Sequence, residues 1–286
     1  MDRKALCLRF WDRSPFFRTQ SYKAYARGFL LQKIREDVGA GDKTAKALNV
    51  PDRLAQAKIF AWEQGIVAGI DEVSLLPEIR VTLHKRDGEA MVKGDVLLSL
   101  QGKLSTLLSY ERTIVNCLQR MSGIATETNT LKQLVEGNCL ILGTRKTIWG
   151  PMDKNALHVG GALTHRLGLH DGILIKKNYT KGLVDAIRIA SKSAEFIEVE
   201  VDSKEAALQV AQAGLAVHVA LLLDNISPAI IRDILASIKD SRILFEASGN
   251  ITSANIKEYA ATGVDAVSIG YLTHSPKSLN ISMYID

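Results

Sequence analysis

The chain has 286 residues, of which 47% are hydrophobic and 23% charged, and its formal net charge is +5. This length allows one large domain or two ordinary domains with substantial cores. No apolar run approaches the roughly 18 residues of a membrane span, and no long Lys/Arg block or aromatic-basic array suggests nucleic acid. The composition therefore argues against membrane spans and nucleic-acid binding, and the modest basic excess fits small polyanionic ligands better.

The first 28 residues form a basic segment. They contain two acidic residues, Asp2 and Asp12, and seven basic ones: Arg3, Lys4, Arg9, Arg13, Arg18, Lys23 and Arg27. Without a clear apolar h-region a secretory signal is not expected, and the few serines give little support to an organellar transit peptide. We interpret residues 1–28 as an N-terminal extension that packs on the surface or on a partner subunit.

Residues 29–124 predict a small α+β unit that ends in a long helix. Apolar residues at helical spacing over 29–37 stop at VGAGD, and 58–68 has the pattern of strand, turn and strand. Short alternating strands over 81–100 surround the turns at Asp87-Gly88 and Lys93-Gly94-Asp95. Residues 104–124 then carry an apolar stripe at helical spacing.

After Gly137 short β-branched runs alternate with helical segments at intervals of roughly 20–25 residues, which is typical of a parallel sheet. Polar residues follow almost every expected strand, and the carboxyl-terminal strand ends of an α/β barrel converge on one mouth. A doubly wound open sheet, the alternative, collects its ligands at one switch point. We therefore favour the barrel. The polar residues at these ends include Thr144, Arg145, Lys146, Lys176, Glu200, Asp224, Ser248 and Gly270.

Cations gather in the stretch from Gly143 to Lys177, between apolar strand-like runs. The stretch holds only two acids, Asp153 and Asp171, and it gathers Arg145, Lys146, Lys154, His158, His165, Arg166, Lys176 and Lys177. Guanidinium groups grip carboxylates and phosphates with two hydrogen bonds, and lysine adds a point charge. The spacing favours an anion-binding cleft over the alternative, a solvated basic face.

Two further signals stand at the strand ends. Glu200 and Asp224 are lone acids there and suit sugar hydroxyls or Mg²⁺, although structural salt bridges to the same cations are an alternative. The loops at 248–250 and 268–270, the second followed by His274, predict a pair of turns that close on a phosphate. The sequence has no Ser-His-Asp order, no CxxC and no HExxH, which disfavours nucleophilic and zinc chemistry. The three cysteines, Cys7, Cys117 and Cys139, have no metal spacing and indicate reduced packing residues of a cytoplasmic protein.

Taken together, several segments resemble the quinolinate phosphoribosyltransferase family from about residue 29 onward. In chain order they are IREDVGAGDKT, GIVAGIDE, YERTIVNCLQRMSGIAT, TRKT, THRLGL, IEVEVD, LLLDN, EASGNIT and TGVDAVSIGYLTHS. The resemblance implies a type II phosphoribosyltransferase with an N-terminal α/β sandwich over 29–123 and an incomplete α/β barrel over 124–286, the last residues returning to the first domain. It also implies a homodimer, or a higher oligomer, with a shared active site.

The resemblance further implies transfer of phosphoribosyl from phosphoribosyl pyrophosphate to quinolinate, with decarboxylation, in NAD biosynthesis. By the resemblance, the catalytic residues are Lys146, Lys176, Glu200 and Asp224, and the last two also hold Mg²⁺ or the ribose. The residues that contact the substrates are Arg112, which reaches across the dimer, and Thr144, Arg145, Lys146, His165, Arg166, Lys176, Glu200 and Asp224. The residues that bind the 5′-phosphate are Ser248, Gly249, Asn250, Ile269, Gly270, Tyr271 and His274.

The sequence departs from the family pattern around the acceptor and pyrophosphate sites. Where this chain has IWGPMDK, the family has a longer run that contains an arginine. His158 stands where the family has another arginine, and Ala162 stands where it has a third glycine. Lys177-Asn178-Tyr179 replaces Asp-Asn-His, and Asn250 replaces a glycine, although asparagine tolerates left-handed backbone geometry. Two alternatives therefore stay open: a paralogous phosphoribosyltransferase for another heteroaromatic acid, such as the molybdenum-associated branch, and a non-catalytic barrel that binds a phosphorylated metabolite.

Overall fold

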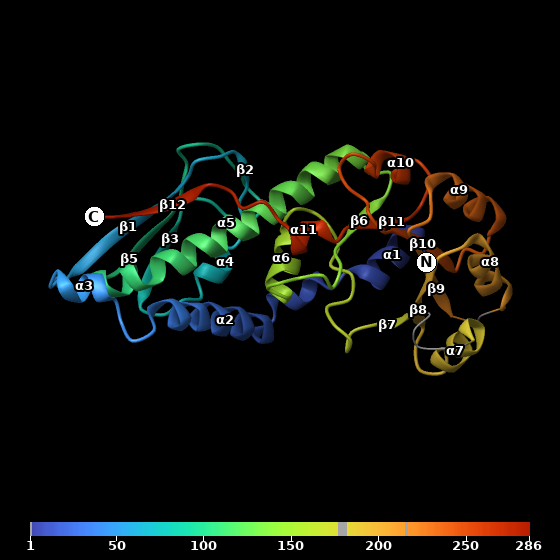
Figure 1. The fold of residues 1–286 in the computed structure, drawn as a ribbon, viewed down its shortest axis with the longest axis horizontal. Helices are drawn as coiled ribbons and strands as arrows, with labels where there is room; N and C mark the ends of the chain where they lie inside the picture. The colour runs from blue at the N-terminus through green and yellow to red at the C-terminus, as the bar shows by residue number, and fades with distance from the viewer. Residues whose placement is uncertain (1, 177–181, 215–216) are drawn as a thin grey trace. The chain divides into compact units, whose positions relative to one another are not determined.

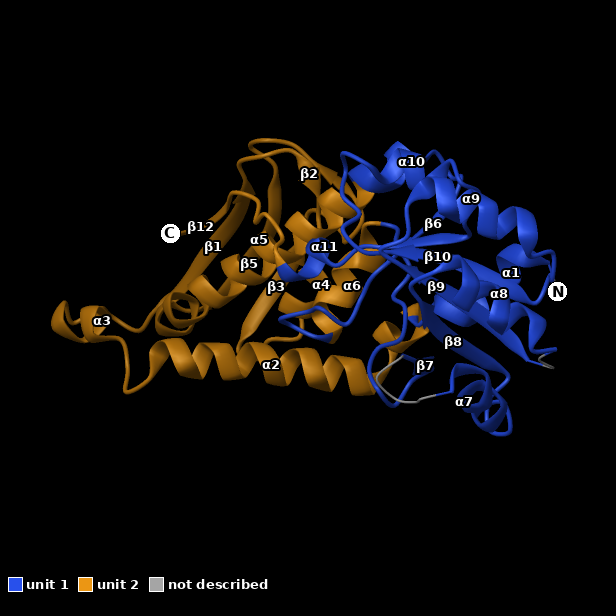
Figure 2. Cartoon of the chain, turned by 45° about the vertical axis from the view of Figure 1, so that its right-hand side comes forward, with its two compact units in different colours: residues 1–13, 130–150, 161–274 blue, residues 14–129, 151–160, 275–286 orange. Residues whose placement is uncertain are grey.

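The computed structural model describes residues 2–176, 182–214 and 217–286. The chain forms two compact units, each assembled from separate stretches (Figure 2). Unit 1 takes residues 1–13, 130–150 and 161–274, and unit 2 takes residues 14–129, 151–160 and 275–286. Among the helices that the model describes, none combines the length and the apolar character that a bilayer crossing requires.

Unit 2 is built on an antiparallel sheet of four strands in the order β12-β1-β5-β3. These strands are β1 (Leu54–Ala61), β3 (Ile79–Leu83), β5 (Val96–Lys103) and β12 (Ile281–Ile285). Burial alternates along β1, as expected of a strand with one face toward a core. The pairing of β12 with β1 brings the C-terminal residues back to this sheet. A separate pair is formed by β2 (Gly65–Ile66) and β4 (Ala90–Met91).

The helices of unit 2 begin and end at residues that favour caps. Helix α2 (Gln20–Val38) starts after Thr19, whose hydroxyl accepts the Tyr22 N–H, and stops at Gly39, where φ is 52°. It thus begins inside the predicted extension. Helix α5 (Leu104–Val135) runs unbroken through the predicted boundary at 123/124 and enters unit 1 at Thr130. The remaining helices are α3 (Lys43–Ala47), α4 (Ile70–Val73), α6 (Pro151–Val159) and the 3₁₀ turn η1 (Ser14–Arg18).

Unit 1 holds a six-stranded parallel sheet in the order β6-β11-β10-β9-β8-β7 (Figure 1). The strands are β6 (Leu140–Leu142), β7 (Ile173–Ile175), β8 (Phe196–Val201), β9 (His218–Asp224), β10 (Ile243–Ser248) and β11 (Ala266–Ser268). Between them stand α7 (Leu183–Ala190), α8 (Lys204–Gln212), α9 (Pro228–Ser237), α10 (Ile256–Ala260) and α11 (Tyr271–His274). This alternation is the expected incomplete α/β barrel. Helix α10 is short, because turns occupy residues 253–255 and 261–263 on either side of it.

The N-terminal residues differ from the predicted surface extension. Helix α1 (Arg3–Trp11) is capped by Asp2, whose carboxylate accepts the Ala5 N–H at 2.7 Å. One face of α1 packs into the core of unit 1. This core cluster consists of Leu6, Cys7, Phe10 and Trp11 from α1 together with Leu142, Ala220, Leu244 and Ala266 from the sheet. The apolar spacing within a basic segment was the signal that the sequence interpretation overlooked.

Candidate active site

Side-chain alternation places a column of polar residues on the interior face of the unit 1 sheet. Glu198 and Glu200 share one face of β8, because alternate side chains of a strand point the same way. Glu198 is in register with Ala220, which packs against α1, so this face is the interior. Asp224 and Ser248 are in register at the carboxyl ends of β9 and β10, on the same face. Glu200, one residue before the end of β8, and Asp224 and Ser248, at the ends of β9 and β10, therefore lie at the mouth where α/β barrels bind ligands.

At this mouth Lys176 and Glu200 form an ion pair. Their Nζ and Oε2 atoms are 2.6 Å apart, and the side chains are 40% and 17% exposed. The expectation that Glu200 is a lone acid is therefore wrong. Because the Lys176 end of this pair is exposed, the pair contributes little to stability, and both groups can exchange partners when an anionic ligand arrives.

The loop after β10 is tied to the loop after β9. Asn225 donates its backbone N–H to Ser248 O at 2.8 Å, and Asn250 Nδ2 donates to Asn225 Oδ1 at 3.0 Å. Gly249 and Asn250 have φ of 96° and 52°, in the left-handed region. A Cβ at Gly249 would lie 2.3 Å from Asn225 Oδ1, so only glycine fits there. Asn250 adopts the left-handed backbone geometry that asparagine tolerates, as the sequence predicts. Its side-chain amide also makes a hydrogen bond that a glycine at this position could not make.

A second loop, after β11, brings Gly270 against Lys146 and His274. A Cβ at Gly270 would lie 3.0 Å from Lys146 Cδ and 3.4 Å from His274 Cδ2. Thr273 Oγ1 donates to Lys146 O at 2.8 Å, and the Lys146 N–H donates to Thr144 Oγ1 at 3.1 Å. Of the neighbouring predicted phosphate residues, Ile269 is buried, and Tyr271 is half-buried at the start of α11. The loops after β6 and β11 thus meet at the same end of the sheet.

The remaining predicted cations have different surroundings. Arg145 is exposed on the loop after β6, with no hydrogen bond or ion pair to the described part of the chain. Arg112 is exposed on α5 in unit 2, again without such a partner among the described residues. His158, on α6, lies against Phe17 with ring centroids 6.0 Å apart. The predicted substitutions at Lys177, Asn178 and Tyr179 lie outside the described residues.

His165 and Arg166 are both buried. The His165 ring is held from two sides: Nδ1 accepts the Arg166 backbone N–H at 2.7 Å, and Nε2 lies 3.0 Å from Glu198 Oε1. Glu246 Oε2 is 3.6 Å from the same Nε2. Burial acts to lower the pKa of His165, but Glu198 and Glu246 outweigh it and raise that pKa to about 10, so Nε2 keeps its proton at neutral pH and points it to Glu198. Both nitrogens of the His165 ring therefore have hydrogen-bond partners within the protein.

The two interior carboxylates have opposite titration behaviour. Burial, reinforced by the nearby charge of Glu198, raises the pKa of Glu246 to about 8. Burial also acts to raise the pKa of Glu198, but His165, Glu246 and Arg166 outweigh it and hold that pKa at about 2. One carboxyl is thus protonated and the other ionised at neutral pH, as expected of two acids that share one site.

The cluster of His165, Glu198 and Glu246 has the composition of a metal site but not its hydrogen bonding. One ligand atom from each of the three lies within 4.8 Å of the others. If a metal cation bound to Nε2 of His165, Nδ1 would have to carry the ring proton. The Arg166 N–H already points at Nδ1 as a donor, so a proton there would meet a second donor. The interior cluster does not fit a metal. At the mouth, the carboxylates of Glu200 and Asp224 offer the hard oxygen ligands that Mg²⁺ prefers.

A cavity of about 970 Å³ lies elsewhere in unit 1, beside α1, β7 and α7. His165 and Arg166 line it, whereas Lys176, Glu200 and Asp224 are not among the described residues of its wall. We place the active site at the mouth instead, because that is where the carboxyl ends of the strands converge.

Sequence reasoning missed Glu198, Glu246 and the tie between Arg13 and Asp171. The first two were detectable, since Glu198 precedes Glu200 and Glu246 precedes Ser248 by two residues on an inward face. The third, an Arg13 Nε to Asp171 Oδ1 contact of 2.8 Å, joins residues 158 positions apart and carries no local signal.

Comparison with known proteins gives two family matches. Residues 42–122 match the N-terminal domain of quinolinate phosphoribosyl transferase, and residues 124–284 match its C-terminal domain. A probable carboxylating nicotinate-nucleotide pyrophosphorylase of Bacillus subtilis (strain 168) is 38% identical over 262 residues, covering 87% of this chain and 89% of that protein. The Mycobacterium leprae (strain TN) nicotinate-nucleotide pyrophosphorylase [carboxylating] is 35% identical over 277 residues, covering 90% and 96%.

Solved structures show the same likeness in three dimensions. The nicotinate-nucleotide pyrophosphorylase from Francisella tularensis superposes with a TM-score of 0.82 at 31% identity, covering 92% of this chain and 97% of that one. NadC from Streptococcus pyogenes gives a TM-score of 0.81 at 32% identity, covering 91% and 95%.

Proposed function

Because this chain belongs to the quinolinate phosphoribosyltransferase family, we propose that it transfers the phosphoribosyl group of phosphoribosyl pyrophosphate to quinolinate. The ring loses CO₂ at the position next to nitrogen, and the products are nicotinate mononucleotide, CO₂ and pyrophosphate. This is the step of de novo NAD biosynthesis that forms the pyridine nucleotide, and the enzyme is a pentosyltransferase. The names of the curated relatives support this reaction.

One observation carries the proposal: the Lys176–Glu200 pair, Asp224 and the Ser248–Asn250 loop stand together on the interior face of adjoining strands. A cation, two carboxylates and a backbone-rich turn are the groups that a phosphorylated sugar with an anionic leaving group requires. The non-catalytic barrel would need neither carboxylate at the mouth.

The cationic side chains of the site offset the electrostatic repulsion between the two anionic substrates. Quinolinate is a dianion and phosphoribosyl pyrophosphate is a polyanion, so the two repel each other in water. Fixed cations offset that repulsion and hold the reactants in contact. We assign the two carboxylates and the pyrophosphate to Arg145, Lys146, Arg166 and Lys176, assisted by Thr144. His165 supports Arg166 through the backbone contact at Nδ1.

Pyrophosphate departs from the sugar through an oxocarbenium-like state, which a nearby carboxylate stabilises. We assign this role to Glu200 and Asp224, and their register on adjoining strands supports the assignment. They would also hold Mg²⁺, which would neutralise charge on the pyrophosphate. We assign the 5′-phosphate to the backbone N–H groups of two loops, 248–250 and 269–271, with His274 beside them.

We further propose a homodimer in which Arg112 completes the partner's active site. Its exposure on α5, without a partner in the described chain, supports this assignment. Arg112→Ala and Lys176→Ala would each abolish most activity alone. Mixed dimers should regain activity, because one of the two sites then carries neither change. Mixtures that stay inactive would argue against a shared site.

The decisive experiment measures pyrophosphate release from phosphoribosyl pyrophosphate with quinolinate, with nicotinate or with no acceptor, each with and without Mg²⁺. We expect release with quinolinate and Mg²⁺ only, accompanied by nicotinate mononucleotide. Release with another pyridine acid but not with quinolinate would instead identify a paralogous transferase. Binding of a sugar phosphate without any release would favour the non-catalytic barrel.

A further inference from the structure

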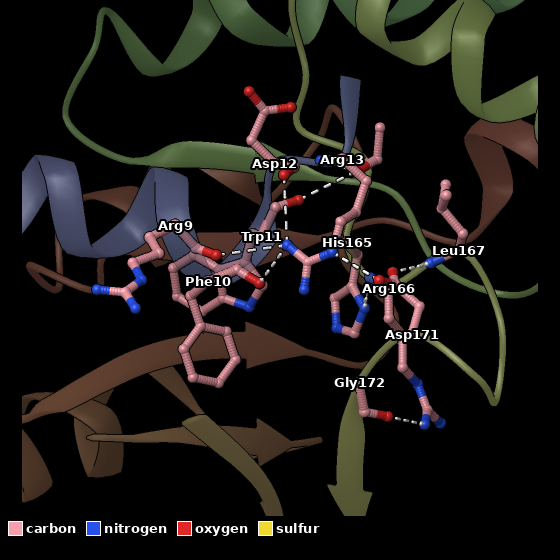
Figure 3. A network of polar contacts seen from close by, with 11 residues as sticks. Arg9, Phe10, Trp11, Asp12, Arg13, His165, Arg166, Leu167, Asp171 and Gly172 are labelled. Atoms are coloured by element: carbon pink, nitrogen blue, oxygen red, sulfur yellow. Dashed lines mark hydrogen bonds and ion pairs between the residues drawn. The ribbon is translucent and has the colours of Figure 1, made fainter. Parts of the chain in front are cut away.

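The N-terminal helix of unit 1 is tied to the loop that carries Arg166 (Figure 3). Neither family match includes α1, because the matched residues begin at 42. The helix buries four apolar side chains in the core of unit 1, so its end at Trp11 has a fixed position. Arg13 lies two residues beyond that end and reaches toward residues 164–172, the segment that we name the Arg166 loop.

Arg13 links the two segments through both its side chain and its backbone. Its Nη1 donates to Phe10 O at 3.1 Å and Asp12 O at 3.3 Å, satisfying carbonyls at the end of α1. Its Nε donates to Asp171 Oδ1 at 2.8 Å. Its backbone N–H donates to Thr164 Oγ1 at 2.8 Å, and that hydroxyl donates to Trp11 O at 3.1 Å. The ion pair is largely shielded, with side chains 25% and 16% exposed.

These contacts bracket His165 and Arg166. Thr164 immediately precedes them, and the second oxygen of Asp171 accepts the Leu167 N–H at 2.7 Å. Arg166 itself donates from Nη1 to Gly172 O at 2.9 Å, next to Asp171. The Asp171 carboxylate therefore joins Arg13 on one side to the backbone next to Arg166 on the other (Figure 3).

The loop needs such support because its backbone is strained. His165 has φ of 56°, a left-handed conformation that a residue with a Cβ adopts only at a cost. Conformations of this kind persist where surrounding contacts determine them. The Thr164 and Asp171 contacts lie on either side of this residue, and Arg13 makes one hydrogen bond to each.

We propose that Arg13 is a positioning residue: through Asp171 and Thr164 it holds the Arg166 loop in the conformation that presents Arg166 to the acid substrate. The effect on substrate rests on the proposed function, whereas the effect on the loop does not. The bland alternative is an ion pair that contributes only to stability. Arg9 supplies a matched control, since it is another arginine of the same segment, its ion pair with Glu195 at 2.8 Å is exposed, and no hydrogen bond or ion pair joins its side chain to the described residues of the loop.

The first test follows the loop itself. Hydrogen exchange of the Leu167 amide should be faster in Arg13→Ala, and in Asp171→Asn to a smaller extent, than in wild type. Arg9→Ala should leave that amide unchanged. Equal protection in Arg13→Ala and Arg9→Ala would overturn the proposal whether or not the protein turns over quinolinate.

The second test follows substrate. Arg13→Ala should raise KM for quinolinate on the order of 10- to 100-fold, because a small misplacement of a positioned group has effects of this size. KM for phosphoribosyl pyrophosphate should change far less. Added ethylguanidinium, which substitutes for the missing side chain, should lower the KM for quinolinate of Arg13→Ala part of the way back to the wild-type value. It should leave the KM of Arg9→Ala unchanged. A purely structural ion pair predicts lower thermal stability with both KM values unchanged, and that result would overturn the inference while leaving the proposed function intact.

Discussion

Glu198 and Glu200 lie two residues apart on β8 and face the same interior, yet their surroundings differ. Glu198 is fully buried and shares its environment with His165 and Glu246. Glu200 reaches the mouth and pairs with Lys176, whose side chain is 40% exposed. One step of roughly 7 Å along a strand separates the two positions. The same residue type therefore serves two purposes within one barrel.

This difference shows that depth determines which ionic groups can meet a ligand. In the interior layer, which consists of His165, Glu198 and Glu246, the His165 ring is held between Glu198 and the Arg166 N–H, so this layer braces the barrel and the Arg166 backbone. The mouth layer holds a weak pair that a polyanion can replace. Changes to the interior layer should therefore act on stability, and changes to the mouth should act on turnover.

The largest expected effect is on stability and comes from Glu198→Ala. Removing one member of a buried charged pair leaves its partners unsatisfied and costs about 3–5 kcal/mol. Denaturant unfolding at neutral pH measures this loss. Glu200→Ala is the matched control, for which we expect a change within about 1 kcal/mol, since the Lys176 end of its pair is exposed. Equal losses in the two variants would remove the distinction between the layers.

The converse effect concerns turnover in Glu200→Ala. If this carboxylate stabilises the departing sugar and holds Mg²⁺, kcat/KM should fall on the order of 100-fold, which is typical of losing one electrostatic contact in a transition state. Steady-state kinetics with both substrates varied gives the value. An unchanged kcat/KM together with reduced stability would place Glu200 among the structural ion pairs.

A smaller effect is the pH dependence of stability, which the interior layer should show and the mouth should not. The pKa of Glu246 is raised from 4.5 to about 8 in the folded protein. Between these values the folded state keeps a proton that the unfolded chain has released, so this stabilisation is complete below pH 4.5 and is lost as pH rises through about 8. Glu246→Gln should flatten this decline, because an amide does not titrate. Unfolding midpoints compared across that range test it, and Glu200→Gln should keep the wild-type slope.

The smallest effect is expected at the mouth, in Asn250→Gly. Glycine adopts the φ of 52° without strain, and only the hydrogen bond to Asn225 is lost. KM for phosphoribosyl pyrophosphate should therefore change by less than about fivefold, equivalent to about 1 kcal/mol. Asn250→Val should have a larger effect, since a β-branched residue is strained there by about 1–3 kcal/mol. If valine were tolerated as well as glycine, the loop geometry would not matter for phosphate binding.

The sequence determined the repeating elements of this protein, because their signals are local. Strand and helix periods located β6 to β11, and Gly39 marked the end of α2. The strand ends located the mouth residues, since parallel strands place their carboxyl ends at one edge. The left-handed turn at Asn250 was also readable, because few residue types tolerate that backbone.

The tertiary structure alone decided how the charges are divided among partners. Which acid meets Lys176, and which acids enclose His165, depends on strand register and on depth in the barrel. The incorporation of α1 into unit 1 and the Arg13–Asp171 tie likewise join residues far apart along the chain. A local pattern encodes which way a side chain points along its own strand or helix. It does not encode the element that folds against it, and for ionisable groups that neighbour sets both the charge and the role.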